Sequence, residues 1–135
     1  MAMQFSVAAR NAALDAIETA IGVSAILKIR TGAVPATCAT ADSGTVLATM
    51  TLPSDWMAAA SGGTKALSGT WQDASADATG TAAHFRIYDS TGTTCHWQGS
   101  VTATGGGGDM TLDNTSIATG QQVTITSCTL TAGGS

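Results

Sequence analysis

Apolar and polar residues alternate over much of the chain between residues 25 and 131. A period of two is typical of strands whose two faces meet different environments. The clearest case is the segment 45–52, where valine, alanine, methionine and leucine alternate mainly with threonine. Further strands are expected at 25–31, 65–73, 110–114 and 121–131. Glycine, proline and aspartate residues separate these runs, which favours a mainly β fold.

Helical periodicity occurs at length only near the amino terminus, in SVAARNAALDAIETAIG. The apolar stripe is Leu14, Ile17 and Ile21, and the polar residues mostly off it are Arg10, Asn11, Asp15 and Glu18. Ser6 is suited to capping the start of a helix, and Gly22 to ending it in the left-handed conformation. We therefore predict a helix over 7–21. Its stripe packs on its own domain or, alternatively, on a neighbouring subunit.

A β-hairpin is predicted at 82–101, because three-residue hairpin loops favour glycine in the left-handed position, as in Ser90-Thr91-Gly92. This loop pairs Asp89 with Thr93, Ile87 with Cys95, Phe85 with Trp97 and Ala83 with Gly99. The other face would pair Tyr88 with Thr94, Arg86 with His96 and His84 with Gln98. One face is then apolar and the other polar, so a one-residue slip would destroy the pattern. The residues expected to be buried are Phe85, Ile87, Cys95 and Trp97.

The remaining segments complete a predicted single domain over residues 1–135. A short turn of helix is expected at 55–60, and a β-bulge near Ser127 would direct both halves of the last strand toward the core. Several short strands, one long helix and no alternation of strands with helices favour an antiparallel β-sandwich. We predict a jelly-roll-like sandwich with one N-terminal α-helix and strands from about residue 25 to residue 131.

The charge content excludes some classes of function. Charged residues make up only 10% of the chain, the net charge is −4 and the five basic residues are scattered. A basic stripe for phosphate contacts is therefore missing, and we expect no direct binding of nucleic acid. There is no run of 18 apolar residues and no signal-peptide pattern at the start, so no membrane association is expected. A weakly charged surface is instead suited to lying against other protein.

The three cysteines, Cys38, Cys95 and Cys128, form no C-x-x-C motif. Their odd number and wide spacing argue against a zinc or redox motif and favour free thiols in a reducing cytoplasm. A Cys95–Cys128 disulfide remains an open alternative at this level.

Residues that could carry chemistry are few. His84 and His96 would lie diagonally on the polar face of the hairpin beside Arg86, whose charge opposes metal binding. The run DASADAT repeats oxygens at every second position like the start of a calcium loop, but Ala78 replaces the required glycine. The four glycines at 105–108 are not followed by the Lys-Ser/Thr of a phosphate loop, and no G-x-S-x-G motif occurs. We predict no enzyme activity, no catalytic residue, no metal site and no cofactor.

The chain resembles a family of small virion proteins of tailed bacteriophages. The segments that carry the resemblance are AARNAALDAIETAIG, LKIRTG, GTVLATMTLPSDWMAAA and GTAAHFRIYDSTGTTCHWQGSVTATGGGGDMTLDN. The resemblance implies a capsid decoration (cement) protein, made in the bacterial host cytoplasm and bound to the outer capsid surface of the virion. Its implied partners are the major capsid protein and a second copy of itself, with a homodimer favoured over a trimer.

The two uncharged ends of the chain are the candidate contact regions for the capsid or the oligomer, since they could lie along a neighbour as arms or an added strand. The residues concerned are Met3, Gln4, Phe5, Ser6, Thr131 and Ala132. Two alternatives remain. One is another phage structural protein, such as a tail or head–tail connector component. The other is a β-sandwich module that binds carbohydrate or cells.

Overall fold

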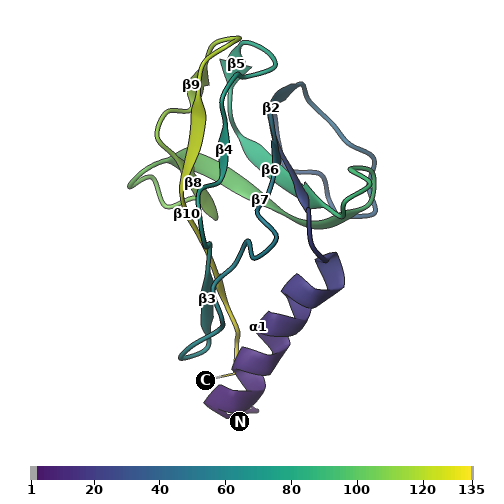
Figure 1. Ribbon diagram of the computed structural model, residues 1–135, viewed down its shortest axis with the longest axis vertical. Coiled ribbons are helices and arrows are strands. Elements are labelled where there is room, and N and C mark those ends of the chain that lie inside the picture. Colours follow the sequence, from purple (N-terminus) through teal and green to yellow (C-terminus); the bar gives the residue numbers. More distant parts are fainter. Residues whose placement is uncertain (1–2, 135) are drawn as a thin grey trace.

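The computed structural model describes residues 3–134, and within them it contains one helix and ten strands (Figure 1). The elements are α1 (Val7–Ile21), β1 (Ile26–Arg30), β2 (Val46–Thr51), β3 (Thr64–Ala66), β4 (Gln72–Asp73), β5 (Gly80–Thr81), β6 (His84–Tyr88), β7 (Cys95–Ala103), β8 (Met110–Leu112), β9 (Ser116–Ile117) and β10 (Val123–Thr131). The fold is mainly β with an N-terminal helix, as predicted.

The helix begins and ends where the sequence predicts. The Ser6 side chain accepts a hydrogen bond from Ala9 N at 3.1 Å, which satisfies one of the unpaired amides of the first turn. At the other end, Gly22 has φ 87° and donates its N–H to Glu18 O at 2.9 Å. A residue with a Cβ adopts that φ only with strain, so glycine ends the helix here.

Most strands belong to one sheet of eight, in which seven strands follow the order β2-β1-β6-β7-β8-β10-β3 and β4 also pairs with β10. The sheet curls, so that β2 and β6 lie across from β4 and β10 (Figure 1). Thr49 N donates to Asp73 Oδ2 at 3.0 Å and Asp77 N donates to Leu47 O at 2.7 Å. The edge strand β2 is therefore hydrogen-bonded to the segment that includes β4, and the fold is sandwich-like.

One pairing corrects the antiparallel expectation, because β7 and β8 are parallel. Parallel neighbours usually need a connection of a dozen or more residues, but only residues 104–109 join these two strands. The glycine run makes the short return possible. A Cβ added at Gly106 would lie 2.7 Å from the Thr102 side chain, and one at Gly108 would lie 2.9 Å from Thr102 N. Only glycine allows this segment to fold back so closely on β7.

The hairpin forms, but its register differs from the predicted one by two residues. Phe85 lies opposite Gly99, and Ile87 lies opposite Trp97. The turn is longer than three residues, with Asp89 N bonded to Thr94 O at 3.2 Å. A bulge between Ile87 and Tyr88 shifts the register once more, so that Tyr88 pairs with Cys95 but Ile87 pairs with Trp97.

The physical reason for the register is the space beside Phe85. A Cβ on Gly99 would lie 2.8 Å from Phe85 Cε1, so a phenylalanine ring fits opposite glycine but would crowd a larger residue. The ring then meets Trp97 edge to face, with centroids 5.6 Å apart. A shift of two residues keeps the same face of each strand inward. Phe85 and Ile87 are buried as predicted, whereas Cys95 and Trp97 are only half-buried.

The expected polar face of the hairpin is not open to solvent. All five residues of β6 are buried, including His84, Arg86 and Tyr88. The loop between β1 and β2, residues 31–45, lies over this face and supplies its hydrogen-bond partners. Sequence periodicity identified the two faces of β6 correctly but could not show that a loop covers the second one.

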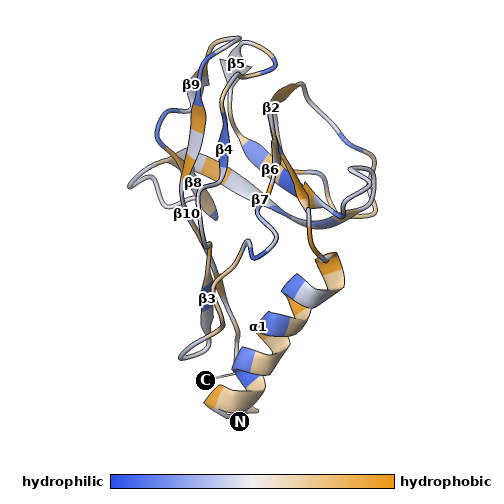
Figure 2. Cartoon of the chain, in the orientation of Figure 1, coloured by the Kyte–Doolittle hydropathy of each residue, from blue (hydrophilic) through white to orange (hydrophobic). Residues whose placement is uncertain are grey.

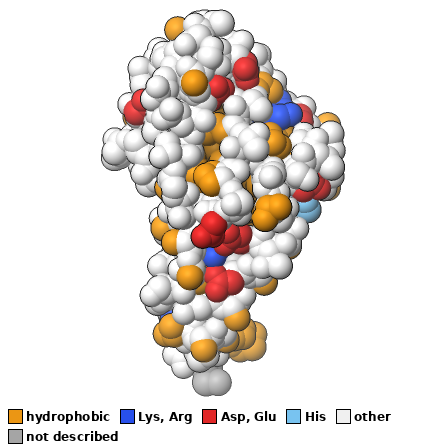
Figure 3. Space-filling view, in the orientation of Figure 1, with side chains coloured by type: hydrophobic (Ala, Val, Ile, Leu, Met, Phe, Trp, Pro, Cys, Tyr) orange, Lys and Arg blue, Asp and Glu red, His pale blue; other side chains and the backbone are white. Residues whose placement is uncertain are grey.

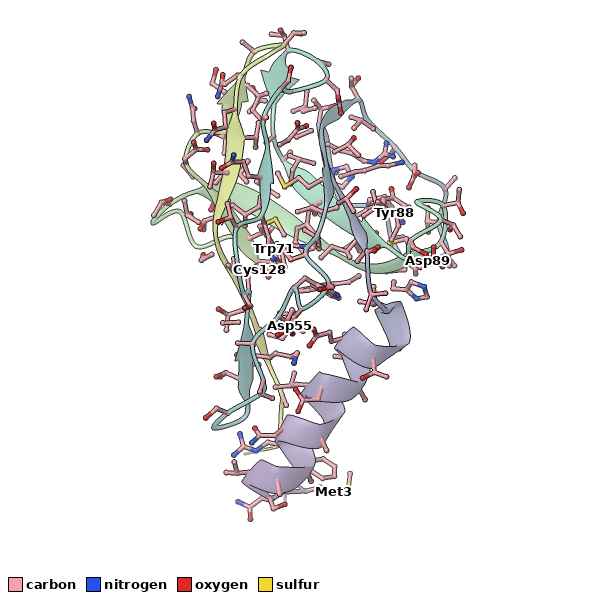
Figure 4. The ribbon with its side chains drawn as sticks, in the orientation of Figure 1. Met3, Asp55, Trp71, Tyr88, Asp89 and Cys128 are labelled. Atoms are coloured by element: carbon pink, nitrogen blue, oxygen red, sulfur yellow. The ribbon has the colours of Figure 1, made fainter. Side chains whose placement is uncertain are left out.

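The core is built around tryptophans held by their ring nitrogens. Trp56 Nε1 donates to Gly22 O at 3.1 Å, and Trp71 Nε1 donates to Trp56 O at 3.0 Å. The two rings lie 5.8 Å apart between their centroids. Trp71 and Cys128, both labelled in Figure 4, belong to the same hydrophobic core cluster. Both tryptophans thus fill the core without leaving a buried N–H unpaired.

Three further expectations concern the bulge in the last strand, a helical turn and the strand at 65–73. The bulge expected near Ser127 is confirmed, since the β10–β8 register shifts between Ile125 and Ser127. The short helical turn at 55–60 is wrong, because only a turn and an isolated bridge between Met57 and Leu67 occur there. The strand expected at 65–73 is divided into β3 and β4.

The glycine return loop gives a first prediction. Gly108→Ala should lower the free energy of unfolding by about 1–3 kcal/mol, because the added methyl group overlaps the Thr102 backbone. Gly133→Ala is the matched control, since a Cβ there meets nothing within 4 Å. Urea unfolding measures both variants. Equal losses would contradict the close-approach explanation.

A second prediction compares two aromatic residues. Trp71→Ala should cost about 3–5 kcal/mol, as expected for a large side chain that is 1% exposed. Trp97→Ala should cost clearly less, because Trp97 is half-buried. Urea unfolding of the two variants checks the order. The reverse order would place Trp97, not Trp71, at the centre of the core.

Candidate functional site

Helix α1 projects from the β body and, with β3 and the last residues of the chain, forms an extension that we call the stalk (Figure 1). The stalk comprises α1, β3 and residues 129–134. The first and last described segments of the chain meet at its tip, where Phe5 N donates to Gly134 O at 2.6 Å. Figure 4 places Met3 at this tip, far from the centre of the β body.

Lys65 on β3 holds the helix to the sheet. Its Nζ lies 2.6 Å from Asp15 Oδ1 and 2.8 Å from Glu18 Oε2, and it also donates to Ala58 O at 2.9 Å. The lysine is only 2% exposed. Figure 3 shows acidic and basic side chains gathered where the stalk joins the body. Two carboxylates and a carbonyl therefore surround an almost buried ammonium group, which satisfies its three donors.

The pKa values of this group follow from its contacts. The hydrogen bond from Lys65, aided by one from Ala60 N, lowers the pKa of Asp15. Burial alone would lower the pKa of Lys65, but its hydrogen bonds to Asp15 and Glu18 outweigh that effect and raise it. Both shifts favour the charged forms of Asp15 and Lys65 at neutral pH.

Two more polar residues of α1 also face the body. Asn11 Oδ1 accepts a hydrogen bond from Gly63 N at 2.9 Å. The Arg10 guanidinium lies so close to Gly63 that a Cβ added there would clash with it. The polar side of the helix is thus used for contacts within the chain, together with Leu14 and Ile21, which are buried.

The opposite side of α1 is exposed and has no charge. We call it the outer face, and it consists of Ala8, Ala9, Ala12, Ala13, Ala16, Ile17, Thr19 and Ala20. The hydropathy colours of Figure 2 show hydrophilic and apolar bands along the same helix. Surface helices usually turn their polar side to water. Here the mainly apolar outer face meets the solvent, and half-buried polar residues meet the protein.

This orientation corrects part of the predicted stripe. Leu14 and Ile21 are buried as expected, but Ile17 is 37% exposed. The contacts of Asp15 and Glu18 with Lys65 rotate the helix toward its polar side and turn Ile17 outward. The helical spacing of the alanines in α1 would allow the outer face to be predicted from the sequence. The prediction made from the apolar stripe did not include it.

The structure brings the predicted contact residues together at the tip of the stalk. Met3 is 82% exposed and Phe5 57% exposed. Gln4 and Ser6 are exposed beside them. Thr131 pairs with Thr64 in the β10–β3 ladder, and Ala132 N donates to Gly63 O at 2.9 Å. Both described ends are thus held by backbone hydrogen bonds within the stalk.

A cavity of about 350 Å³ lies at the tip of the stalk. It is lined by Phe5, Ala9, Arg10, Ala13, Ala132 and Gly133.

A second polar cluster lies between β6 and the loop of residues 31–45, which we call the covering loop. Arg86 Nη1 lies 2.5 Å from Asp42 Oδ1, and Tyr88 Oη donates to the same oxygen at 2.7 Å. Arg30 Nη2 reaches Asp42 Oδ2 at 3.0 Å. Burial alone would raise the pKa of Asp42, but hydrogen bonds from Tyr88 and Arg86 outweigh it and lower the pKa.

The two histidines are not brought together. His84 is fully buried, and its Nδ1 lies 2.8 Å from Gly32 O, whereas His96 Nε2 lies 3.5 Å from Asp89 Oδ2 in the β6–β7 turn region. Asp73 and Asp77 use their carboxylates to bind β2. Within residues 3–134, no group of three or more His, Cys, Asp or Glu side chains is arranged to hold a metal ion.

Comparison with known proteins identifies no relative: no family model, no curated protein and no solved structure matches the chain. Among the described residues, no helix combines the length and the apolar character that crossing a membrane would require.

The carboxylates give a prediction about pH. Asp15, Asp42 and Asp89 have pKa values lowered in the folded protein, so the unfolded chain binds more protons in acid. Their stabilising effect is complete above the unfolded value of about 4 and is lost as the pH falls through the lowered folded values. Urea unfolding between about pH 2 and pH 7 should show the free energy of unfolding rising with pH in the acid part of this range.

Asp15→Asn should reduce that acid dependence and also lower the melting temperature at neutral pH, because Lys65 loses one of its two carboxylates. Asp55→Asn, at an exposed position in the turn after β2, serves as the control. An unchanged acid dependence in Asp15→Asn would show that the Lys65 contacts do not stabilise the stalk.

Proposed function

We propose that this protein is a bacteriophage capsid decoration protein, which binds the outer surface of the assembled shell and stabilises contacts between major capsid protein subunits. The observation that supports the proposal most directly is the outer face of α1. A projecting helix exposes a surface of alanine and isoleucine, while the polar residues Asp15 and Glu18 contact the body. The resemblance of the sequence to small tailed-phage virion proteins points to the same class.

The lack of charge on the outer face lowers the free-energy cost of contact with another protein. Binding a charged surface requires removing water from ions, whereas an outer face without charge avoids that cost. Alanine also lets another backbone approach closely, because its side chain is a single methyl group. Each copy would contribute a modest contact, and repetition over a symmetric shell would add those contacts together. A shell under outward pressure from packaged DNA gains stability from each bound copy by mass action.

The proposed assembly is a homodimer rather than a trimer, formed after synthesis in the host cytoplasm and located on the outer capsid surface of the virion. A two-fold pair is the commonest closed arrangement of identical chains. It would present two stalks to the shell. The exposed side chains of Met3 and Phe5 at the stalk tip extend the same contact region.

The burial of the tryptophans and the tyrosine weighs against a carbohydrate-binding module. Such a module needs exposed rings on which a sugar can stack. Trp56, Trp71 and Tyr88 are at most 1% exposed, and Trp97 is half-buried against the core. A tail or connector component remains the competing proposal, and the number of copies per particle distinguishes it from a decoration protein.

A binding experiment tests the proposal. The purified chain is mixed with shells of its phage that lack it, and bound copies and heat resistance of the shells are measured. We expect hundreds of copies per shell and a higher temperature of shell disruption. Ala12→Glu/Ala16→Glu, which places charge on the outer face with a residue of good helix propensity, should reduce binding about tenfold or more.

Ala39→Glu/Ala118→Glu is the matched control, since it adds the same charge at exposed positions away from the stalk. It should bind like the wild type. Reduced binding of this control alone would assign the contact to another surface. No binding to shells, or occupancy at a single vertex, would overturn the decoration proposal, and the second result would favour a connector.

A further inference from the structure

Polar contacts join the covering loop to the sheet. Gln98 Nε2 donates to Pro35 O at 2.7 Å, and Arg86 Nη2 donates to Thr37 O at 2.9 Å. Asp42 accepts from the buried cluster described above. Most of the loop's residues are exposed, and none belongs to the hydrophobic core. A loop of this length without secondary structure is unusual in a compact fold, and its hold on the sheet depends on hydrogen bonds and ion pairs.

Two cysteines lie at the point where the covering loop meets the sheet. Cys38 is in the loop and Cys95 is the first residue of β7, and both line one surface cavity of about 580 Å³ with Arg86 and Asp42. Both are half-buried free thiols, within reach of solvent. Cys128 is different, because it is 2% exposed and lies in the core.

Neighbouring contacts hold the two thiols near each other. Arg86 Nη2 is 3.4 Å from Cys38 O, which anchors the backbone of the loop beside β6. On the other side, Tyr88 pairs with Cys95 in the β6–β7 ladder. Burial, with a smaller effect of the neighbouring Cys38 thiol, raises the pKa of the Cys95 thiol to about 11. The cysteine pair considered from the sequence, Cys95 with Cys128, is therefore not the pair that the fold brings together.

We propose that Cys38 and Cys95 form an intrachain disulfide when the folded protein meets a small-molecule disulfide such as oxidised glutathione, and that this bond locks the covering loop onto the sheet. The site is an oxidative modification site that the decoration role neither requires nor explains. The proposed disulfide concerns the isolated chain, so its test is independent of capsid binding.

The reaction is an ordinary thiol–disulfide exchange. The Cys38 thiolate attacks one sulfur of the small disulfide, forms a mixed disulfide and releases one small thiolate. Cys95 then loses its proton to solvent, and its sulfur attacks the Cys38 sulfur and expels the second small thiolate. The two protein thiols are oxidised, and one small disulfide is reduced to two thiols. Burial raises the pKa of the Cys95 thiol, so we assign the first attack to Cys38.

The effect of the bond follows from the position of the two residues in the chain. A link between the β1–β2 loop and β7 closes a long segment of chain, so it restricts the unfolded state strongly. It also adds a covalent connection where the loop now has only polar ones. We expect the melting temperature to rise by about 10 °C and amide hydrogen exchange in the covering loop to slow.

The experiment uses the full-length chain without shells. Reduced protein is incubated with oxidised glutathione under native conditions, alkylated and analysed by intact mass and peptide mapping. The expected product is a monomer that has lost two hydrogen atoms, with Cys38 joined to Cys95. Cys128→Ser should give the same bond and the same rise in melting temperature.

Cys38→Ser and Cys95→Ser are the matched variants. Each should lack the intrachain bond, and neither should show the rise, while their reduced melting temperatures report whether they fold normally. Products with only glutathione adducts, intermolecular dimers or a bond to Cys128 would overturn the proposed pair. A Cys38–Cys95 bond that changes neither melting temperature nor hydrogen exchange would overturn the proposed locking of the loop.

Discussion

The ammonium group of Lys65, almost buried between Asp15 and Glu18, determines how α1 sits on the protein. A buried cation without partners would cost several kcal/mol, so the two carboxylates must face inward. That requirement turns the polar side of the helix toward β3 and leaves the outer face to solvent. The stalk and the proposed attachment surface both depend on this contact.

The same physical rule applies at the other polar cluster. Arg86 is 2% exposed on the second face of β6, and the covering loop brings Asp42 and backbone carbonyls to its guanidinium. The long loop can therefore remain close to the sheet without an apolar anchor of its own. Contacts of this kind hold the loop in position, and they place Cys38 next to Cys95.

Local patterns predicted the local elements well. The bounds of α1 follow from Ser6, the apolar stripe and Gly22, all of which act within a few residues. The bulge near Ser127 follows from the change of apolar face along β10. The hairpin register was missed because turn residues near Gly92 do not reveal that Phe85 needs the space beside Gly99. A contact across the sheet decided that register, and no local pattern encodes it.

By itself, the sequence determined the mainly β fold, the position of the helix and the shortage of charge, because periodicity and composition act locally or on the whole surface. Tertiary structure alone decided that β7 and β8 are parallel, that β6 is covered on both faces and that Cys95 neighbours Cys38. It also decided which side of α1 is exposed. The parallel pairing depends on the close return of the glycine loop on Thr102. The other three features depend on where Lys65 and Asp42 find partners distant in the chain, and satisfying a buried charge can outweigh the apolar pattern of a single helix.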